Sequence, residues 1–486
     1  MDQSHEHARR SVASGARAPL WTPERAEHHL RSLELFGMRF GLDRMRRMMT
    51  ALGSPQQGFA AIQVLGTNGK SSTTRMIAAI LERHGVRTGV YTSPHLVSYN
   101  ERLRIGERDV SPEAFAQAIA RAAHAAEQVD RTLAGDDHVT QFELLTAAAL
   151  SEMAEQRIEL AVVEAGLGGR YDATSVIDAP LTVLTNVALE HTRWLGPTIS
   201  DIAGEKLAVV RPGGTLVLGA GLAPEARAVA DHVAAERRAR VIVAPATGEP
   251  PVDARGGASG ASTGRASDAR GGASWTATDR PSTAAASSAP ATVDSTARAR
   301  LRAAGEFQQA NFALARTAAQ TWLEATQIEL DEWAVRSAAR ETEVPGRLQV
   351  LARDPLIVLD GAHNPDAVAA LVPSLPGVIG ERRLGLVMGV LEDKDAAGML
   401  ATLLARCDRA WFTAPRSPRA LSPAALHSLA RQLGFDAASC EPEPARALAQ
   451  ASDWARTGAP DARAVLVTGS IYLVGALIGG PQGSRR

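Results

Sequence analysis

A glycine-bearing loop between an apolar run and a helix-like pattern constrains the fold of this chain more than any other feature. The loop is GTNGKSSTT, Gly66 to Thr74, and the apolar run FAAIQVLG at 59–66 leads into it. Four apolar residues then recur at helical spacing over 76–81, and Gly85 ends the pattern. Backbone N–H groups in such a turn point at phosphate oxygens, and the helix dipole favours an anion there. The segment therefore predicts a strand, a phosphate-binding loop and a helix in succession.

Lys70 and the two serines after it give this loop its chemistry. In a phosphate loop the lysine reaches the terminal phosphates of a nucleotide, and a following serine, here Ser71 or Ser72, can meet a magnesium ion. The alternative is a turn with a surface lysine, but the strand before it and the helix after it favour phosphate binding. Val64 stands where a general nucleotide-binding loop has glycine. The loop thus predicts a nucleotide site and leaves the reaction open.

Buried strands alternate with helix-like segments along most of the chain. LAVVEAG (160–166), LTVLTNV (181–187) and GTLVLG (214–219) are short apolar runs of the same kind. A helical stretch at 305–323 leads to a second series of strands, LIVLDGAHN, LGLVMGVL, AWFTAP and AVLVTGS. Such alternation implies an α/β fold with mainly parallel sheets covered on both faces.

Local composition sets the expected domain limits. Residues 245–298 are dominated by Ala, Gly, Ser, Thr, Asp and Pro, so this segment cannot bury a core and is predicted to be a disordered insertion. We expect a disordered tail at 1–20 and a nucleotide-binding domain at 21–343 that carries the insertion. A smaller α/β domain is expected at 344–486.

Charge and composition limit the partners. The 52 basic and 53 acidic residues nearly cancel and aromatic residues make up 4% of the chain, so neither charge nor stacking argues for a nucleic-acid partner. The N-terminal tail lacks the apolar core of a signal peptide, and no apolar span is long enough to cross a bilayer. We therefore expect a cytoplasmic protein with small-molecule substrates and no membrane partner. Cys407 and Cys440 are not in metal-ligand spacing and are expected to be buried apolar side chains.

An ordered set of motifs resembles those of one family. GTNGKSSTT, with no glycine at position 64, is similar to the phosphate loop of the Mur ligase superfamily. The resemblance runs from about Leu33 to Leu477, apart from the insertion, and is strongest to the branch that contains dihydrofolate synthase and folylpolyglutamate synthase. Two motifs depart from the family's usual form, with GKSS in place of GKGS and DATS in place of DATN. The other landmarks, in family order, are FGMRFGLDRM, LGSP, YTSPHL, VVEAGLGGRYDATS, LEHTRWLG, IAGEKLAVVR, PGR, DGAHNP, LEDKD and VTGS.

The resemblance implies a fold and a reaction. The fold is a central P-loop domain of the Mur ligase kind with a mainly parallel sheet, followed by a smaller, Rossmann-like C-terminal α/β domain. The reaction is an ATP-dependent amide ligation, in which a substrate carboxylate takes the γ-phosphate as an acyl phosphate and an amine then displaces phosphate. In this branch, L-glutamate is added to dihydropteroate and to the glutamate tail of reduced folates. ATP is the co-substrate, two Mg²⁺ ions screen the phosphates, and a monomer is expected.

Four residues match the family's metal positions: Ser93, Glu164, His191 and Lys206. Each has an ordinary alternative, because a serine before proline is common turn chemistry, a glutamate at a strand end can be solvated, and a histidine can simply pack in a turn. In the family this lysine is commonly carbamylated by carbon dioxide, and a carbamylated Lys206 is expected here. Its alternative is a helix-surface lysine beside Glu205. Together with Lys70, His191 and Lys206 form the expected catalytic set.

The same resemblance assigns nucleotide contacts to both domains. Asn311 matches the family asparagine near adenine, whereas Arg347, Asp360 and His363 match groups that touch the ribose and the phosphates. The alternatives are a surface charge for Arg347 and helix capping for Asp360 and Asn364. Because the groups divide between two domains, ATP should favour domain closure. The full expected ATP-binding set is Gly66, Thr67, Asn68, Gly69, Lys70, Ser71, Ser72, Asn311, Arg347, Asp360 and His363.

Substrate choice rests on Thr140, Phe142 and Asp172. They match pterin- and folate-binding positions of bifunctional relatives, where an aromatic ring stacks on the pterin and a carboxylate bonds its amino-pyrimidine edge. Phe142 could equally be a core residue. GGRYDATS is close to the form found in enzymes with both activities, which favours the bifunctional interpretation. The alternatives are a folylpolyglutamate synthase alone, another Mur-type amino-acid ligase such as one acting on a UDP-linked muramyl peptide, and a nucleotide-binding regulator without turnover.

Overall fold

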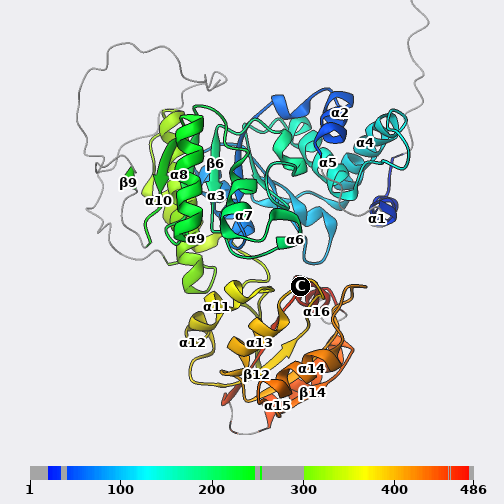
Figure 1. Cartoon of the computed structure of the whole chain (residues 1–486), viewed down its shortest axis with the longest axis vertical. Helices are drawn as coiled ribbons and strands as arrows, with labels where there is room; N and C mark the ends of the chain where they lie inside the picture. Colours follow the sequence, from blue (N-terminus) through cyan, green and yellow to red (C-terminus); the bar gives the residue numbers. More distant parts are fainter. Residues whose placement is uncertain are drawn as a thin grey trace, which may run out of the picture.

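The structure, a computed structural model, describes residues 20–33, 41–246, 252–253, 300–457, 459 and 461–480. Within these residues the chain forms two bodies, each on its own sheet, and Figure 1 places the N-terminal body above the C-terminal one. The predicted boundary at 343/344 falls between the end of α10 (Glu332–Glu341) and the start of β10 (Gln349–Arg353). The predicted tail, except Leu20, and most of the predicted insertion lie outside the described residues.

The N-terminal body is built on a sheet with the order β4-β3-β2-β5-β1-β6-β7-β8-β9. The strands from β2 to β8 in this order pair in parallel, while β3, β4 and β9 are antiparallel at the edges. All residues of β5 are buried, which is expected of a parallel strand covered on both faces. The strand bounds are β1 (Ala60–Leu65), β2 (Thr88–Tyr91), β3 (Leu103–Ile105), β4 (Arg108–Asp109), β5 (Leu160–Glu164), β6 (Leu181–Leu184), β7 (Thr215–Leu218), β8 (Arg240–Val243) and β9 (Val252–Asp253).

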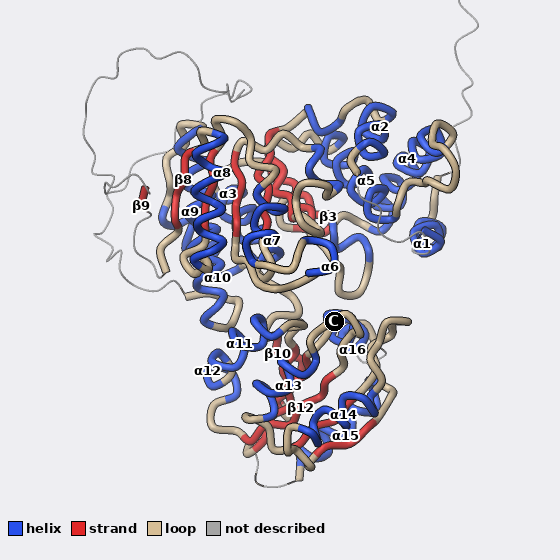
Figure 2. The backbone as a smooth tube through the Cα atoms, viewed as in Figure 1, coloured by secondary structure: helices blue, strands red, loops and turns tan. Residues whose placement is uncertain are grey.

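Helices cover both faces of this sheet (Figure 2). On one face α3, α9 and α10 pack over a core that includes Val162, whereas its neighbour Val163 points to the opposite face, under α4 and α5. Helices α7 and α8 continue that second face over β6 and β7. The remaining bounds are α1 (Pro23–Leu33), α2 (Asp43–Ala51), α3 (Lys70–Arg83), α4 (Pro112–Asp130), α5 (Gln141–Glu155), α6 (Thr192–Leu195), α7 (Ile199–Leu207), α8 (Pro224–Arg237), α9 (Glu306–Ala325) and the 3-10 helices η2 (Pro55–Gln57), η3 (Tyr99–Arg102) and η4 (Ala173–Val176).

The C-terminal body repeats the architecture on a smaller scale. Its sheet has the order β10-β11-β15-β12-β13-β14, with β10 antiparallel and the others parallel. Apolar cores lie on both faces, with Leu386 on one and Val387 on the other. The bounds are β11 (Leu356–Leu359), β12 (Arg383–Met388), β13 (Arg409–Phe412), β14 (Ala438–Cys440), β15 (Arg463–Thr468), α11 (Pro365–Ser374), α12 (Pro376–Ile379), α13 (Ala396–Leu404), α14 (Pro423–Gln432), α15 (Pro444–Arg456) and α16 (Ile471–Ile478).

The α/β prediction with mainly parallel sheets is confirmed in both bodies. The apolar runs predicted as strands contain β1, β5, β6 and β7, and the predicted helix at 305–323 is α9. The expectation for Cys440 is wrong, because its side chain is exposed at the end of an edge strand, whereas Cys407 is partly buried. In the described part of the chain, none of the helices has both the length and the apolar character that a membrane span requires.

The loop after β2 in the N-terminal body packs against the C-terminal body. Leu96 in this loop packs against the core that α15 and α16 form on the C-terminal sheet. A Cβ atom at Gly475, in the middle of α16, would overlap the carbonyl oxygen of Leu96. Glycine at this position therefore lets the helix and the loop of the other body approach each other backbone to backbone.

We expect Gly475→Ala to separate these two segments. A helical Gly→Ala exchange by itself favours folding by about 1 kcal/mol, but here the methyl group meets a backbone atom that cannot turn aside. Overpacking of this kind costs about 1–3 kcal/mol, so the steric effect wins and the melting temperature should fall. Gly377→Ala in α12 is the matched control, because nothing lies within 4 Å of its Cβ position. Equal melting temperatures for the two variants would contradict the contact.

Candidate active site

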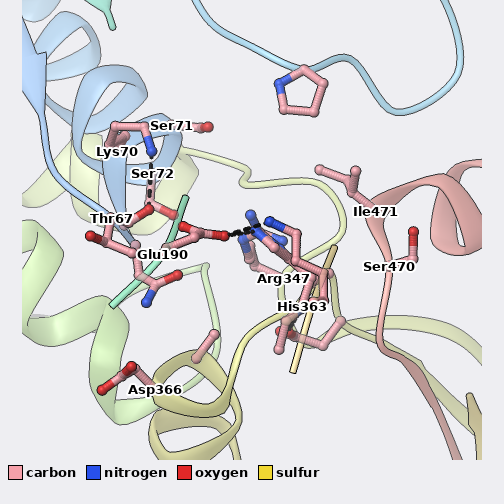
Figure 3. Close-up of a pocket in the computed structure, with 18 of the residues that line it drawn as sticks. Thr67, Lys70, Ser71, Ser72, Glu190, Arg347, His363, Asp366, Ser470 and Ile471 are labelled. Atoms are coloured by element: carbon pink, nitrogen blue, oxygen red, sulfur yellow. Dashed lines mark hydrogen bonds and ion pairs between the residues drawn. The ribbon is translucent and has the colours of Figure 1, made fainter. Parts of the chain in front are cut away.

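A cavity of about 340 Å³ lies between the two bodies. Its upper wall comes from the loop after β1, the end of β5 and the loop after β6, all at the carboxyl ends of parallel strands. Its lower wall comes from the loops after β11 and β12 and from the start of α16. Open α/β sheets bind ligands at this edge, in the crevice where neighbouring connections run to opposite faces. Figure 3 shows Lys70 and Thr67 on one side facing Arg347 and His363 on the other.

The phosphate loop is held open by the neighbouring strand end. Asn186 accepts from the backbone N–H groups of Thr67 and Asn68, through its carbonyl oxygen at 3.0 Å and its Oδ1 at 2.8 Å. The Thr185 hydroxyl donates to the carbonyl oxygen of Asn68 at 2.7 Å. The first residues of α3, Lys70, Ser71 and Ser72, line the cavity, and a helix leaves the N–H groups of its first turn without intrahelical partners. The loop is therefore preorganised for an anion.

Two glycines are required by the geometry of this loop. Gly66 has φ +143° and Gly69 has φ +83°, a region that favours glycine. A Cβ at Gly69 would also overlap Oδ1 of Asn311, whose side chain reaches over the loop from α9. The residue predicted to lie near adenine thus borders the phosphate loop. Its amide donates to Oε1 of the buried Gln308 at 3.0 Å, which fixes the orientation of the Asn311 side chain.

Lys70 folds back on its own loop. Its Nζ donates to the carbonyl oxygen of Thr67 at 3.0 Å, as Figure 3 shows. The side chain lines the cavity at the N-terminal end of α3, where the helix dipole adds to its positive charge. A terminal phosphate in the cavity would offer Lys70 a charged acceptor in place of a neutral carbonyl, a stronger bond of the charge-assisted kind.

Glu164 is a buried carboxylate at the end of β5, not a solvated charge. It is 2% exposed. The Ser71 hydroxyl donates to its Oε1 at 3.0 Å, and the backbone N–H of Ser93 donates to its Oε2 at 3.1 Å. Burial raises its pKa, while the nearby charge of Lys70 acts in the opposite direction. The structure thus brings together three of the residues expected around the metal and selects Ser71, not Ser72, as the serine that faces Glu164.

His191, directly before α6, and Lys206, in α7, are the other two residues that match the family's metal positions. His191 precedes α6 in a left-handed conformation with φ 53°, and it lines the cavity. Burial, with the charge of Lys394, lowers its pKa to about 4, so its ring is neutral and able to act as a ligand. Lys206 is 5% exposed, so the surface-lysine alternative is wrong. Its Nζ donates to the carbonyl oxygen of Gly66 at 2.9 Å, and burial lowers its pKa to about 7.

The donor set fits a magnesium ion that arrives with phosphates. In the described ranges, no three His, Cys, Asp or Glu side chains converge as a complete metal site. The cavity instead offers the Glu164 carboxylate, the hydroxyl groups of Ser71 and Ser93, and the His191 ring. Mg²⁺ is usually held by one or two carboxylates together with substrate phosphates and water, not by an all-protein cage. A single buried carboxylate beside a phosphate loop matches that pattern.

The C-terminal body contributes Arg347, Asp360 and His363. All three line the cavity. Asp360 is buried and accepts from the backbone N–H groups of Leu348 at 2.9 Å and Ala362 at 2.8 Å. A Cβ at Gly361 would overlap the Arg347 guanidinium, so the arginine lies directly across this glycine. Asp360 therefore fixes the loop that presents Arg347 and His363.

Asn364 caps a helix, as the alternative for it predicted, and it also contacts the phosphate loop. Its Oδ1 caps α11 by accepting from the backbone N–H of Ala367 at 2.8 Å. Its Nδ2 donates to Oδ1 of Asn68 at 3.0 Å, and Nδ2 of Asn68 donates back to Oδ1 of Asn364 at 3.3 Å. The phosphate loop and the C-terminal body are thus joined by a reciprocal pair of amide hydrogen bonds.

The residues predicted to bind pterin do not line this cavity. Asp172 is buried and caps η4, accepting from the backbone N–H of Thr174 at 3.0 Å and from that of Leu167 at 2.7 Å. Phe142 packs on Tyr91, and with Asp172 it lies behind Gly166, which does line the cavity. Thr140 caps α5. Gly66 and Lys206 also sit behind the cavity wall. Phe142 and Asp172 therefore lie outside the cavity, behind one of its walls.

Sequence reasoning missed Glu190, Lys394 and Asn186, which all line the cavity. One available signal would have found Lys394. Only three of the 52 basic residues are lysines, at positions 70, 206 and 394. All three lie at or directly behind the cavity, and every other basic residue of the chain, including Arg347 in the same cavity, is an arginine. In a chain that uses arginine by default, a lysine marks a place where a compact ammonium group is needed.

Family models match both bodies. The Mur ligase middle domain matches residues 64–221, and the Mur ligase glutamate ligase domain matches residues 346–471. The first range holds the phosphate loop, Glu164 and His191, and the second holds Arg347, Asp360 and His363. A phosphate-loop body and a glutamate-ligase body on two sides of one cavity define a Mur-type ligase.

Comparison with individual proteins shows which family of Mur ligases the chain resembles. The chain is 31% identical to the dihydrofolate synthase/folylpolyglutamate synthase of Escherichia coli, over 92% of each protein. It is 33% identical to a probable bifunctional folylpolyglutamate synthase/dihydropteroate synthase of Haloferax volcanii over 92% of this chain, but it spans only 49% of that protein. The structure of Mycobacterium tuberculosis folylpolyglutamate synthase complexed with ADP matches with a TM-score of 0.79 and 28% identity, over 96% of this chain and 98% of the other. This chain belongs to the dihydrofolate synthase/folylpolyglutamate synthase family of Mur ligases.

Proposed function

We propose that this protein is an ATP-dependent ligase that joins L-glutamate to dihydropteroate and extends the glutamate tail of reduced folates. The observation that carries the proposal is the cavity itself, where Lys70 and Glu164 of one body face Arg347 and His363 of the other. The names of the family relatives supply the substrates, and the ADP in the mycobacterial neighbour supports ATP as the phosphate donor.

The chain's own residues suit both steps of such a ligation. In the first step a substrate carboxylate attacks the γ-phosphate, ADP leaves, and an acyl phosphate forms. Lys70, Arg347 and the first-turn N–H groups of α3 hold the negative oxygens in place. In the second step the amine of L-glutamate attacks the acyl carbon and phosphate departs. Magnesium held by Glu164, Ser71, Ser93 and His191 would screen the charge of the phosphates.

We also propose that Lys206 is carbamylated. The ammonium group first loses a proton, and the neutral amine then adds carbon dioxide and releases a second proton, so that an anion replaces a cation. Burial favours the neutral amine, and the lowered pKa of about 7 leaves a substantial neutral fraction at physiological pH. The amine lies behind Gly66, so the resulting carboxylate would face the phosphate-loop region. A second magnesium ion, the cytoplasmic location and the monomeric state stay predictions from the sequence.

Asp172→Asn tests the assignment of the pterin pocket. If the carboxylate bonds the amino-pyrimidine edge, its loss removes a charge-assisted hydrogen bond, and kcat/KM for dihydropteroate should fall about 10- to 100-fold. Extension of tetrahydrofolate should fall much less. Because Asp172 also caps η4, melting curves must accompany the rates. Equal losses of both activities together with a lower melting temperature would indicate a structural role only.

Ligation with labelled glutamate tests the proposed function directly. The purified protein is given ATP, magnesium and labelled L-glutamate, with dihydropteroate in one reaction and tetrahydrofolate in another. Product in both reactions is expected. Product with tetrahydrofolate alone would indicate a folylpolyglutamate synthase, and product in neither, with ATP still bound, would favour another Mur-type substrate or a binding protein without turnover.

A further inference from the structure

Glu190 is contacted by two basic side chains of the opposite body. Lys394 Nζ lies 2.8 Å from Glu190 Oε1, and His363 Nε2 lies 3.2 Å from the same oxygen. Lys394 comes from the loop between β12 and α13, and His363 from the loop after β11. Each of the side chains of Glu190 and Lys394 is only 10% exposed. One carboxylate of the N-terminal body therefore holds two loops of the C-terminal body.

The ion pair between Glu190 and Lys394 is costly to break. A carboxylate and an ammonium group with so little exposure each lose hydration, and removing either one takes from the other its nearest opposite charge. Glu190 would then keep the more distant His363, and Lys394 would keep Asp393 at 3.6 Å.

The loop that carries Glu190 is also tied to the phosphate loop. Two residues earlier, the backbone N–H of Ala188 donates to the Thr67 hydroxyl at 3.0 Å. One residue later comes His191, whose left-handed conformation turns the chain sharply into α6. Glu190 thus lies in a short segment that is bonded to the phosphate loop at Thr67 and continues into His191, which lines the cavity.

The use of lysine points to the same pair. Lys394 is the one lysine of three that no expected catalytic or ATP-binding role accounts for. An arginine could also neutralise Glu190, but its planar fork needs more room than an ammonium group does. The short distance to one oxygen, shared with the His363 ring, suits a compact cation.

We infer that Glu190 and Lys394 are positioning residues whose ion pair sets the C-terminal body over the phosphate loop for phosphoryl transfer. The inference rests on the proposed ligase function. In the paired arrangement His363 and Arg347 face Lys70 across the cavity (Figure 3). Without the pair, the amide bonds between Asn68 and Asn364 and the contact of Leu96 with α16 would still connect the bodies. Arg347 and His363 would, however, no longer be held opposite Lys70.

A double-mutant cycle with Glu190→Gln and Lys394→Gln tests the inference. Each single variant should lower kcat for ligation about tenfold, in the range of coupling between contacting residues, with a small change in KM for ATP. The double variant should be no slower than the slower single variant, because one contact is lost in all three. Multiplied losses in the double variant would overturn the inference, since they would mean that each residue acts on the substrates separately.

Small-angle X-ray scattering gives a readout that does not depend on turnover. With a non-hydrolysable ATP analogue, both single variants should keep a larger radius of gyration than the unmodified protein. Asp461→Asn is the matched control, because it breaks the Arg382–Asp461 ion pair, which lies within the C-terminal body, with the aspartate largely exposed. Closure of the single variants equal to that of the unmodified protein would overturn the inference. Failure of the proposed function would appear differently, as an unmodified protein that makes no product.

Discussion

Lys70→Ala should lower the rates of ligation and ATP turnover about 10³-fold. The side chain lines the cavity at the start of α3, 3.0 Å from the carbonyl oxygen of Thr67, and has only to swing from that carbonyl to reach a terminal phosphate. Loss of one preorganised donor to a charge that develops in the transition state typically lowers kcat about 10²- to 10³-fold. Because Lys70 supplies a full positive charge, we expect the upper end of that range. The measurement is single-turnover formation of ADP and of labelled product.

The fold should survive this substitution. Lys70 is only partly buried and its one hydrogen bond is to a loop carbonyl, so melting curves of the variant and the unmodified protein should nearly coincide. Lys70→Arg is the charge-matched control, and it should recover little activity, because the guanidinium fork does not fit where an ammonium group meets a phosphate next to a tight loop. Normal ligation by Lys70→Ala would contradict the assignment of the phosphate loop.

The local pattern around the phosphate loop could be predicted because its causes are local. An apolar run, two glycines and helical periodicity fix β1, the loop and α3 within about 25 consecutive residues. The carboxyl ends of parallel strands meet at one edge, so Glu164 at the end of β5 and the segment after β6 could also be expected near the loop. The sequence could place these groups at one site because the strands that carry them belong to one parallel sheet and end at the same edge.

What joins the two bodies could not be predicted in the same way. Glu190 and Lys394 are separated by 204 positions, and Asn68 and Asn364 by 296. Neither hydrophobic periodicity nor a turn signal relates residues at such separations, since their proximity depends on how two finished sheets pack. The burial of Lys206 was hidden for a related reason. Its helix α7 has an ordinary amphipathic sequence, and only the position of the phosphate loop behind it decides that the ammonium group is enclosed.

Lys206→Met should lower the ligation rate about 10²-fold or more, as expected when a charged group that organises a phosphate site is lost. Methionine has a similar length and no charge, so the buried site stays filled. The substitution also removes the free-energy cost of burying the ammonium group of Lys206. The pKa of Lys206 is about 7 in the folded chain and 10.5 in an unfolded one, so folding is opposed most strongly below pH 7 and less as the pH rises toward 10.5. At pH 7 the variant should therefore melt no lower than the unmodified protein while being nearly inactive.

The same pKa predicts how the activity of the unmodified protein depends on pH and carbon dioxide. Below pH 7 the amine of Lys206 is mostly protonated and cannot add carbon dioxide, whereas above pH 7 it is mostly neutral. Activity should rise as the pH passes through about 7, and it should fall when bicarbonate is removed and return when it is restored. With only three lysines in the chain, a single carbamate signal in the ¹³C NMR spectrum of protein treated with labelled bicarbonate can be assigned by its loss in Lys206→Met. Full activity without bicarbonate, or a carbamate signal that persists in the variant, would show that Lys206 acts as an ammonium group held against the carbonyl oxygen of Gly66.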